Sequence, residues 1–228
     1  MSVGNVIITG GASGLGAATA EAVAGHGGTP MVIDKKVPAG DVAYSYADLA
    51  DTSAVDAAVR GLADLVDGQI HGVFTAAGID SCGPLDGVAA KDWEQVIYVN
   101  LLGTVAVVRS ALPFLKATGG RIVTCASTLG IKAVGDATAY CASKFGVVGF
   151  SRALAAELAG QVGVTVLIPG GMYTPFFDGR DDQYKPPPDA KLNKPEDVAA
   201  TVVFALSQPP GCEVREMVVC ASTESSWP

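Results

Sequence analysis

The sequence is poor in charged residues and contains no cluster of basic side chains. Only 17% of its 228 residues are charged, and 23 acidic against 15 basic side chains give a formal net charge of −8. Because nucleic acids and anionic lipids are bound chiefly through Lys and Arg, this balance argues against both partners. The chain is also 49% hydrophobic, which excludes an intrinsically disordered protein.

Cysteine and histidine are too few and too scattered to build a disulfide framework or a metal site. The five cysteines contain no CxxC pair and show no zinc-like spacing with either of the two histidines. An odd number of cysteines without such patterns predicts small buried residues in a reduced compartment. They are Cys82, Cys125, Cys141, Cys212 and Cys220.

The sequence also lacks a basic N-terminal region and a long uninterrupted apolar run. No Lys or Arg precedes Lys35, and glycines interrupt the first residues, so a secretory signal is not predicted. The most apolar later segment, residues 101–115, contains Arg109 and is shorter than the roughly 18 residues that a membrane span needs. We therefore expect a cytoplasmic protein with no membrane partner.

Short β-branched runs alternate with longer segments of helical periodicity. Strands are predicted near residues 6–8, 31–33, 42–46, 73–74, 121–125, 164–168 and 214–220. Helices are predicted over residues 15–24, 53–66, 92–115, 138–159 and 195–207, with Ser53 as the cap of the second. This alternation implies right-handed crossovers and a parallel sheet covered on both faces. The length fits one domain, residues 1–228.

A glycine-rich turn, Thr-Gly-Gly-Ala-Ser-Gly-Leu-Gly over residues 9–16, joins the first predicted strand to the first predicted helix. Its glycines permit a close approach of the backbone to a pyrophosphate, and the helix N-terminus offers free N–H groups. Asp34 ends the second predicted strand, where a carboxylate can bind an adenosine ribose and repel a 2′-phosphate. The alternative for Asp34 is a solvated strand-end residue. The two features together predict dinucleotide binding. With the seven predicted strands and the helices between them, the expected fold is a three-layer, doubly wound α/β Rossmann fold with a seven-stranded parallel sheet and helices on both faces.

Tyr140 and Lys144 are spaced so that they share one face of a predicted helix. An ammonium beside a phenol favours the phenolate and lowers a pKa that starts near 10, which yields an acid/base usable near neutral pH. This spacing is common by chance. Ser127 strengthens it, because it follows the strand predicted at residues 121–125, at the edge where sites in such sheets open.

Taken in order, these residues resemble the short-chain dehydrogenase/reductases, in their compact single-domain branch. The resemblance covers essentially the whole chain and also includes Asn100 and Pro-Gly-Gly-Met-Tyr-Thr at residues 169–174. It implies hydride transfer between a nicotinamide cofactor and a ketone or secondary alcohol, with Tyr140 as the proton donor or acceptor. Lys144 would lower the pKa of Tyr140 and hold the nicotinamide ribose. Ser127 would orient the substrate oxygen, and Asn100 would support a water-linked proton relay.

The same resemblance implies a cofactor site and no metal. The residues it assigns to the cofactor are Gly10, Ser13, Gly14, Leu15, Gly16, Asp34, Asp48, Leu49, Ala77, Gly78, Tyr140, Lys144, Pro169, Gly170, Met172 and Thr174. Asp48 would bond the adenine ring, and Thr174 the nicotinamide carboxamide.

NAD(H) is the expected cofactor, ahead of NADP(H). Asp34 would repel a 2′-phosphate, and Ser13 stands where phosphate-preferring relatives often carry a basic residue. Lys35 and Lys36 keep the alternative of an NADPH-dependent carbonyl reductase open.

The sequence departs from the family pattern in two places. Thr75-Ala76-Ala77-Gly78 stands where the family usually has Asn-Asn-Ala-Gly, and residues 221–228 lack the usual Asp-Gly-Gly ending. Thr75 is a candidate to replace part of the missing Asn bonding. These departures give some support to an alternative hypothesis, a non-catalytic nucleotide sensor or scaffold. The presence of Ser127, Tyr140 and Lys144 argues against it, because a sensor does not need an activated phenol.

The long irregular stretch at residues 176–194 predicts a mobile substrate lid. The side chains expected to line the pocket are mostly apolar: Ile79, Leu129, Ile131, Met172, Tyr173, Phe176 and Phe177. We therefore expect an uncharged, mainly apolar small-molecule substrate, unless Lys132, Arg180 or Lys185 enters the site. Residues 103–115 and 145–158 contain more apolar side chains than one face of the sheet needs. In the resembled family these two helices form a bundle between subunits, which implies a homotetramer or homodimer.

Overall fold

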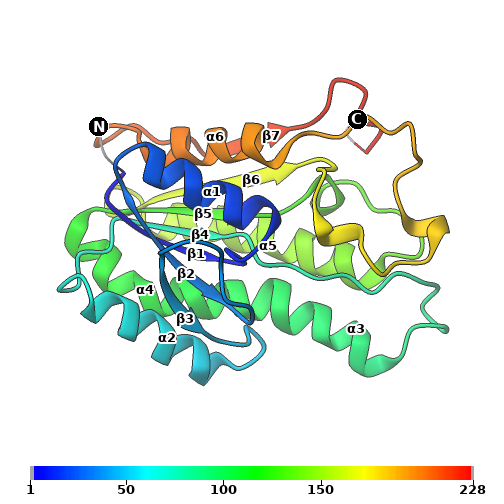
Figure 1. Cartoon of the computed structure of the whole chain (residues 1–228), viewed down its shortest axis with the longest axis horizontal. Coiled ribbons are helices and arrows are strands. Elements are labelled where there is room, and N and C mark those ends of the chain that lie inside the picture. Colours follow the sequence, from blue (N-terminus) through cyan, green and yellow to red (C-terminus); the bar gives the residue numbers. More distant parts are fainter. Residues whose placement is uncertain (1–2, 227–228) are drawn as a thin grey trace.

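A seven-stranded sheet runs through the centre of the protein (Figure 1). The computed structural model describes residues 3–226, and within them every strand pairs in parallel, in the order β3-β2-β1-β4-β5-β6-β7. The strands are β1 (Asn5–Thr9), β2 (Thr29–Asp34), β3 (Ala43–Tyr46), β4 (Gly72–Thr75), β5 (Arg121–Cys125), β6 (Gly163–Pro169) and β7 (Glu216–Val219). The order reverses between β1 and β4, which makes the fold doubly wound and opens a crevice at the carboxyl ends of these strands.

Helices cover both faces of the sheet (Figure 1). One face carries α1 (Gly14–Gly25) and α6 (Pro195–Leu206), and the other carries α2 (Thr52–Asp64), α4 (Thr104–Thr118) and α5 (Thr138–Glu157). The residues of β1 alternate between the two cores. Val6 and Ile8 pack on the side of α1 and α6, and Ile7 packs on the opposite side. Because both faces are covered, the inner strands such as β1 and β4 are buried on both sides, whereas the edge strands β3 and β7 are partly exposed.

A single long helix crosses the second face of the sheet. α3 (Ala90–Ile97), the π-helical turn η1 (Tyr98–Gly103) and α4 follow one another without a break over Ala90–Thr118. This helix extends the predicted helix 92–115 at both ends, and unlike the segment 101–115 alone it has the length and apolar composition of a membrane span. Of its most apolar window, 44% is buried inside the fold. A single helix of this kind is weak evidence for a span, because core helices of soluble proteins can have the same length and composition.

Two local sequence predictions are wrong. The cap of α2 is Asp51 rather than Ser53, because the Asp51 carboxylate accepts the N–H groups of Ser53 and Ala54, both at 3.0 Å. Cys212 is exposed rather than buried. The prediction of buried cysteines is confirmed for Cys125 and Cys141, which both lie in the core.

A long segment follows β6 beyond the carboxyl ends of the strands (Figure 1, yellow to orange). It contains two short 3₁₀ turns, η3 (Pro175–Phe177) and η4 (Asp182–Tyr184). A β-bridge between Met172 and Asn193 pairs its two ends, so the segment forms a loop that leaves the sheet and returns to the same place. Residues 176–194 thus lie at the edge where the sequence places the functional site.

Candidate active site

The glycine-rich turn after β1 is packed too closely to accept side chains. A Cβ at Gly16 would overlap the carbonyl group of Gly10, and a Cβ at Gly10 would lie 2.8 Å from the Cα of Ala77. Gly10 also has a φ of 70°, a conformation that favours glycine. The turn therefore presents bare backbone and the N-terminus of α1 to the crevice, which fits a pyrophosphate.

Asp34 is fixed against this turn at the end of β2. Its Oδ2 accepts the N–H of Ala12 at 3.0 Å, and its Oδ1 accepts the N–H of Lys36 at 2.9 Å. The carboxylate therefore stands beside the turn, where it is available to the ribose of a dinucleotide. These contacts and the bare glycine backbone fit a nicotinamide dinucleotide.

Lys35 points to another carboxylate. Its Nζ lies 2.9 Å from Oδ2 of Asp48, and the hydrogen bond between them raises the pKa of Lys35. Two hydrogen bonds, first from the N–H of Ala50 and second from Lys35, hold the pKa of Asp48 below its ordinary value. An ammonium group engaged in this way is less free to meet a 2′-phosphate.

Tyr140 and Lys144 lie in the first two turns of α5, and both are buried. Lys144 Nζ donates to the carbonyl of Cys125 at 2.8 Å and lies 5.6 Å from the centre of the Tyr140 ring. Ser127 follows β5, and its hydroxyl accepts the N–H of Leu129 at 3.1 Å. Three of the four residues that the sequence assigns to catalysis thus lie close together at the carboxyl end of β5, with the Ser127 hydroxyl beside that of Tyr140.

Burial dominates the electrostatics of this group. It raises the pKa of Tyr140, the neighbouring Cys125 adds to the rise, and the Ser127 hydroxyl opposes it. Burial also lowers the pKa of Lys144. The lowering of the Tyr140 pKa that the sequence predicts is therefore not found in this arrangement. Here the Phe176 ring covers Tyr140, with 5.6 Å between the ring centres.

Asn100 ties the β4 side of the site to α5. Its side chain is fully buried, its Oδ1 accepts the N–H of Ile79 at 2.8 Å, and its Nδ2 donates to the carbonyl of Ile79 at 2.8 Å. The same Nδ2 donates to Ser143 Oγ at 3.0 Å. A Cβ at Gly78 would lie 3.5 Å from both Asn100 Oδ1 and Lys144 Nζ, so the missing side chain leaves room between these groups.

The departure at Thr75 is not compensated by its own hydroxyl. Thr75 Oγ1 is buried and makes no hydrogen bond within residues 3–226. The nearby N–H of Ala77 is instead bound by Thr9 Oγ1 at 3.2 Å. Within the described residues, Thr75 therefore does not replace the missing Asn bonding through a protein partner.

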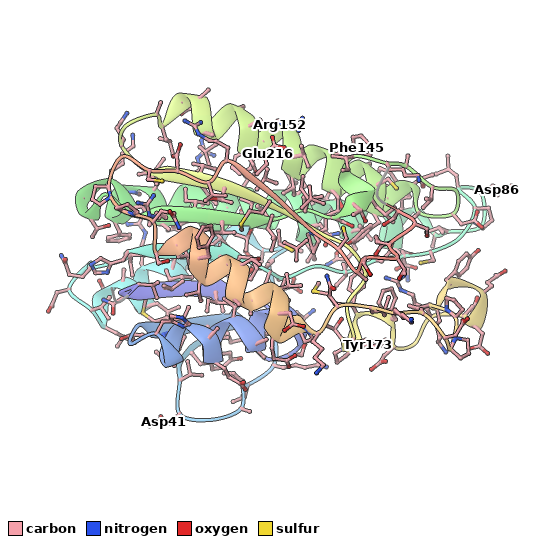
Figure 2. The ribbon with its side chains drawn as sticks, turned by 90° about the horizontal axis from the view of Figure 1, so that it is seen from above. Asp41, Asp86, Phe145, Arg152, Tyr173 and Glu216 are labelled. Carbon is pink, nitrogen blue, oxygen red and sulfur yellow. The ribbon has the colours of Figure 1, made fainter. Side chains whose placement is uncertain are left out.

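The segment after β6 packs against β7 and against the glycine-rich turn. The N–H of Gly170 donates to the carbonyl of Val219 at 3.0 Å, and a Cβ at Gly14 would lie 3.3 Å from the Cβ of Thr174. The glycine-rich turn and the segment assigned to the nicotinamide end are thus in contact. Met172, Tyr173 and Thr174 also line a cleft of about 540 Å³ together with residues between 177 and 192 (Figure 2 labels Tyr173).

Sequence reasoning missed two acidic residues beside the site. Asp80 forms an ion pair with Arg180 of the segment above it, and Glu224 Oε2 accepts the N–H of Gly171 at 2.9 Å. Each contact joins residues that are far apart in the sequence. Neither lies in a motif, so no local signal identifies them.

Replacing Gly16 by Ala should weaken NADH binding by about tenfold or more, because the new Cβ would push the turn away from the Gly10 carbonyl. Gly25→Ala is the matched control, since it lies in the same helix and a Cβ there meets nothing within 4 Å. Both affinities follow from titration of nicotinamide fluorescence. Equal affinity in the two variants would contradict the assigned role of the turn.

The comparisons with known proteins agree with this geometry. The sequence profile of the family described as short chain dehydrogenase matches residues 4–185. Levodione reductase of Leifsonia aquatica is 30% identical over 233 residues, covering 89% of this chain and 86% of that protein. D-threitol dehydrogenase of Mycolicibacterium smegmatis is 33% identical over 221 residues, covering 88% and 85%.

A solved structure shows the same fold over nearly its whole length. The closed form of serine dehydrogenase, complexed with NADP⁺, matches with a TM-score of 0.87 at 25% identity, covering 97% of this chain and 96% of that one. The profile match spans most of the chain, and the two curated relatives are at least 30% identical to it. This chain therefore belongs to the short-chain dehydrogenase/reductase family, and it is an NAD(P)-dependent oxidoreductase that acts on a CH–OH group.

Proposed function

We propose that the protein transfers a hydride between NAD(H) and an uncharged, mainly apolar ketone or secondary alcohol, with Tyr140 as the general acid/base. The observation that carries this proposal is the convergence of Ser127, Tyr140 and Lys144 beside the glycine-rich turn. When bound, the cofactor supplies or accepts the hydride. The chain positions the reacting carbon, excludes water and moves the proton.

The proton moves at the hydroxyl of Tyr140. In reduction this hydroxyl gives its proton to the substrate oxygen as that oxygen gains charge, and in oxidation it takes the proton back. Ser127 lies beside it and orients the same oxygen. Because burial raises the pKa of Tyr140, the closed site keeps the phenol protonated, as a proton donor must be.

Lys144 has donors to spare for the cofactor. An ammonium carries three N–H donors, and the Cys125 carbonyl takes one of them at 2.8 Å. The space beside Gly78 lies next to the same nitrogen. Lys144 would hold a ribose hydroxyl from this position, and the Asn100 carboxamide would keep the facing loop in place.

The preference for NAD(H) is supported by two contacts. Asp34 is held beside the glycine-rich turn by the N–H groups of Ala12 and Lys36, so its carboxylate faces the expected ribose. Lys35 is paired with Asp48 rather than directed into the crevice. The NADP⁺ complex of the serine dehydrogenase shows that the fold also accommodates the phosphorylated cofactor, which makes the local charges decisive.

Wild-type protein should bind NADH more tightly than NADPH, and Asp34→Ala should reduce this preference by about tenfold, because the variant loses both the ribose acceptor and the charge that repels a 2′-phosphate. Asp51→Ala, which removes a carboxylate from the start of α2, is the control of equal charge change. The measurement is a fluorescence titration with each cofactor. A wild-type preference for NADPH would contradict the assignment and favour a carbonyl reductase.

The substrate side of the site is covered mainly by apolar side chains. Arg180 also reaches it, with its charge paired to Asp80, and Lys185 lines the cleft described above. Phe176 packs on Tyr140, and Leu129 belongs to the same cluster. These contacts support an uncharged substrate whose entry requires residues 176–194 to move as a lid. The lid and the cytoplasmic location of the protein stay predictions.

Exposed apolar side chains support a homotetramer or homodimer. Tyr98, Leu102 and Phe145 are 44%, 42% and 45% exposed, and they lie on η1 and α5 (Figure 2 labels Phe145). Large apolar groups that remain exposed on neighbouring helices are typical of subunit interfaces. We propose that a second copy of the chain covers them.

Tyr140→Phe should abolish turnover, by about 10²-fold or more, and leave NADH affinity nearly unchanged, because only the proton-transferring hydroxyl is removed. Tyr98→Phe, which removes a hydroxyl outside the proposed catalytic group, is the control. A panel of uncharged ketones with NADH, and of secondary alcohols with NAD⁺, provides the assay. Retained turnover in Tyr140→Phe would contradict the role of Tyr140 as the general acid/base. A wild type that binds NADH but turns over no member of the panel would favour the nucleotide-sensor alternative.

A further inference from the structure

Arg180 belongs to the segment 176–194, and its side chain contacts the loop after β4 beside the proposed catalytic residues. Its Nη2 lies 3.2 Å from Oδ2 of Asp80, which sits on the loop after β4. The side chains of Arg180 and Asp80 are only 15% and 5% exposed. Charges so far removed from water are tolerated when they are paired.

Asp80 is held in place by its own loop. Its Oδ1 accepts the N–H of Ser81 at 2.7 Å, and its Oδ2 accepts the thiol hydrogen of Cys82 at 3.2 Å. The residue before it, Ile79, is bound on both its N–H and its carbonyl by Asn100. The carboxylate is therefore a fixed partner that Arg180 meets when residues 176–194 cover the site.

Arg180 is also packed against the aromatic cover of Tyr140. Its guanidinium carbon lies 4.5 Å from the ring centre of Phe176 and 4.8 Å from that of Phe177. Phe176 in turn packs on the Tyr140 ring. The Phe176 ring therefore lies between the Arg180 guanidinium and the ring of Tyr140, the proposed acid/base, and contacts both.

The pairing of Arg180 is incomplete. Its Nη2 is buried and makes no hydrogen bond of regular geometry within residues 3–226, so the contact with Asp80 is what compensates its charge. Without Asp80, a buried guanidinium with open donors would stand beside the substrate site. Such a group binds carboxylates strongly.

We propose that the Asp80–Arg180 pair sets the charge selectivity of the substrate site, admitting neutral substrates and excluding anionic ones. An anionic substrate that bound Arg180 would leave the Asp80 carboxylate buried without its partner, whereas a neutral substrate leaves the pair intact. This inference rests on the proposed function and adds to it a specificity determinant that lies outside the catalytic group.

The experiment uses 4-oxopentanoate and its methyl ester, which carry the same ketone and differ in charge. Their binding is measured by isothermal titration calorimetry, without cofactor and with NAD⁺, which cannot reduce a ketone. The wild type should bind the anion about tenfold more weakly than the ester, or not measurably. Asp80→Asn, which keeps the size and the acceptor for Ser81, should gain about tenfold in affinity for the anion and change little for the ester.

Two further variants identify the cause. Asp136→Asn removes an equal charge from a residue that also contacts residues 176–194, through the hydroxyl of Tyr184 at 3.1 Å, and it should behave like the wild type. Adding Arg180→Gln to Asp80→Asn should abolish the gain.

The proposal is overturned by any of three results. These are a wild type that binds the anion at least as well as the ester, an Asp80→Asn variant without the gain, and an equal gain in Asp136→Asn. Loss of NAD⁺ binding in the wild type would contradict the proposed function instead, and the titrations without cofactor would still decide the role of the pair.

Discussion

The two-sided hydrogen bonding between the Asn100 side chain and the backbone of Ile79 is the constraint on which the site depends. A fully buried amide must satisfy its donors and acceptor within the protein, and here it does so on one residue of the β4 loop and on Ser143 of α5. Asn100 itself belongs to the π-helical turn η1. One side chain therefore fixes three elements relative to one another.

The functional groups follow from that constraint. The β4 loop carries Gly78 and Asp80, α5 carries Tyr140 and Lys144, and the Asn100 amide holds the loop against the helix. Both groups are buried, which raises the pKa of the phenol and lowers that of the ammonium. Burial also explains why the charges in the site are paired or bound to the backbone, since an unpaired buried charge would be costly.

The parts that sequence predicts well are those whose geometry is local. The glycine-rich turn needs small residues at fixed offsets, and the spacing of Tyr140 and Lys144 places both on one helix face whatever surrounds them. The alternation of strands and helices also yielded the parallel sheet, which is confirmed in all seven strands within residues 3–226.

The parts that sequence did not predict depend on distant contacts. Burial raises the pKa of Tyr140, and Phe176, from a distant segment, is one of the side chains that pack on its ring. The pairing of Arg180 with Asp80 joins residues a hundred positions apart, and Lys35 is drawn to Asp48 rather than to the crevice. No pattern within one segment carries such information.

The most direct test of this account is hydrogen–deuterium exchange of the Ile79 N–H in the wild type and in Asn100→Ala, with the amides of β1 as the internal reference. We expect strong protection of Ile79 in the wild type and exchange about tenfold faster or more in the variant, with β1 unchanged and NADH affinity reduced. Unchanged protection of Ile79 would contradict it, as would an equal loss of protection in β1 or full NADH affinity after the protection is lost.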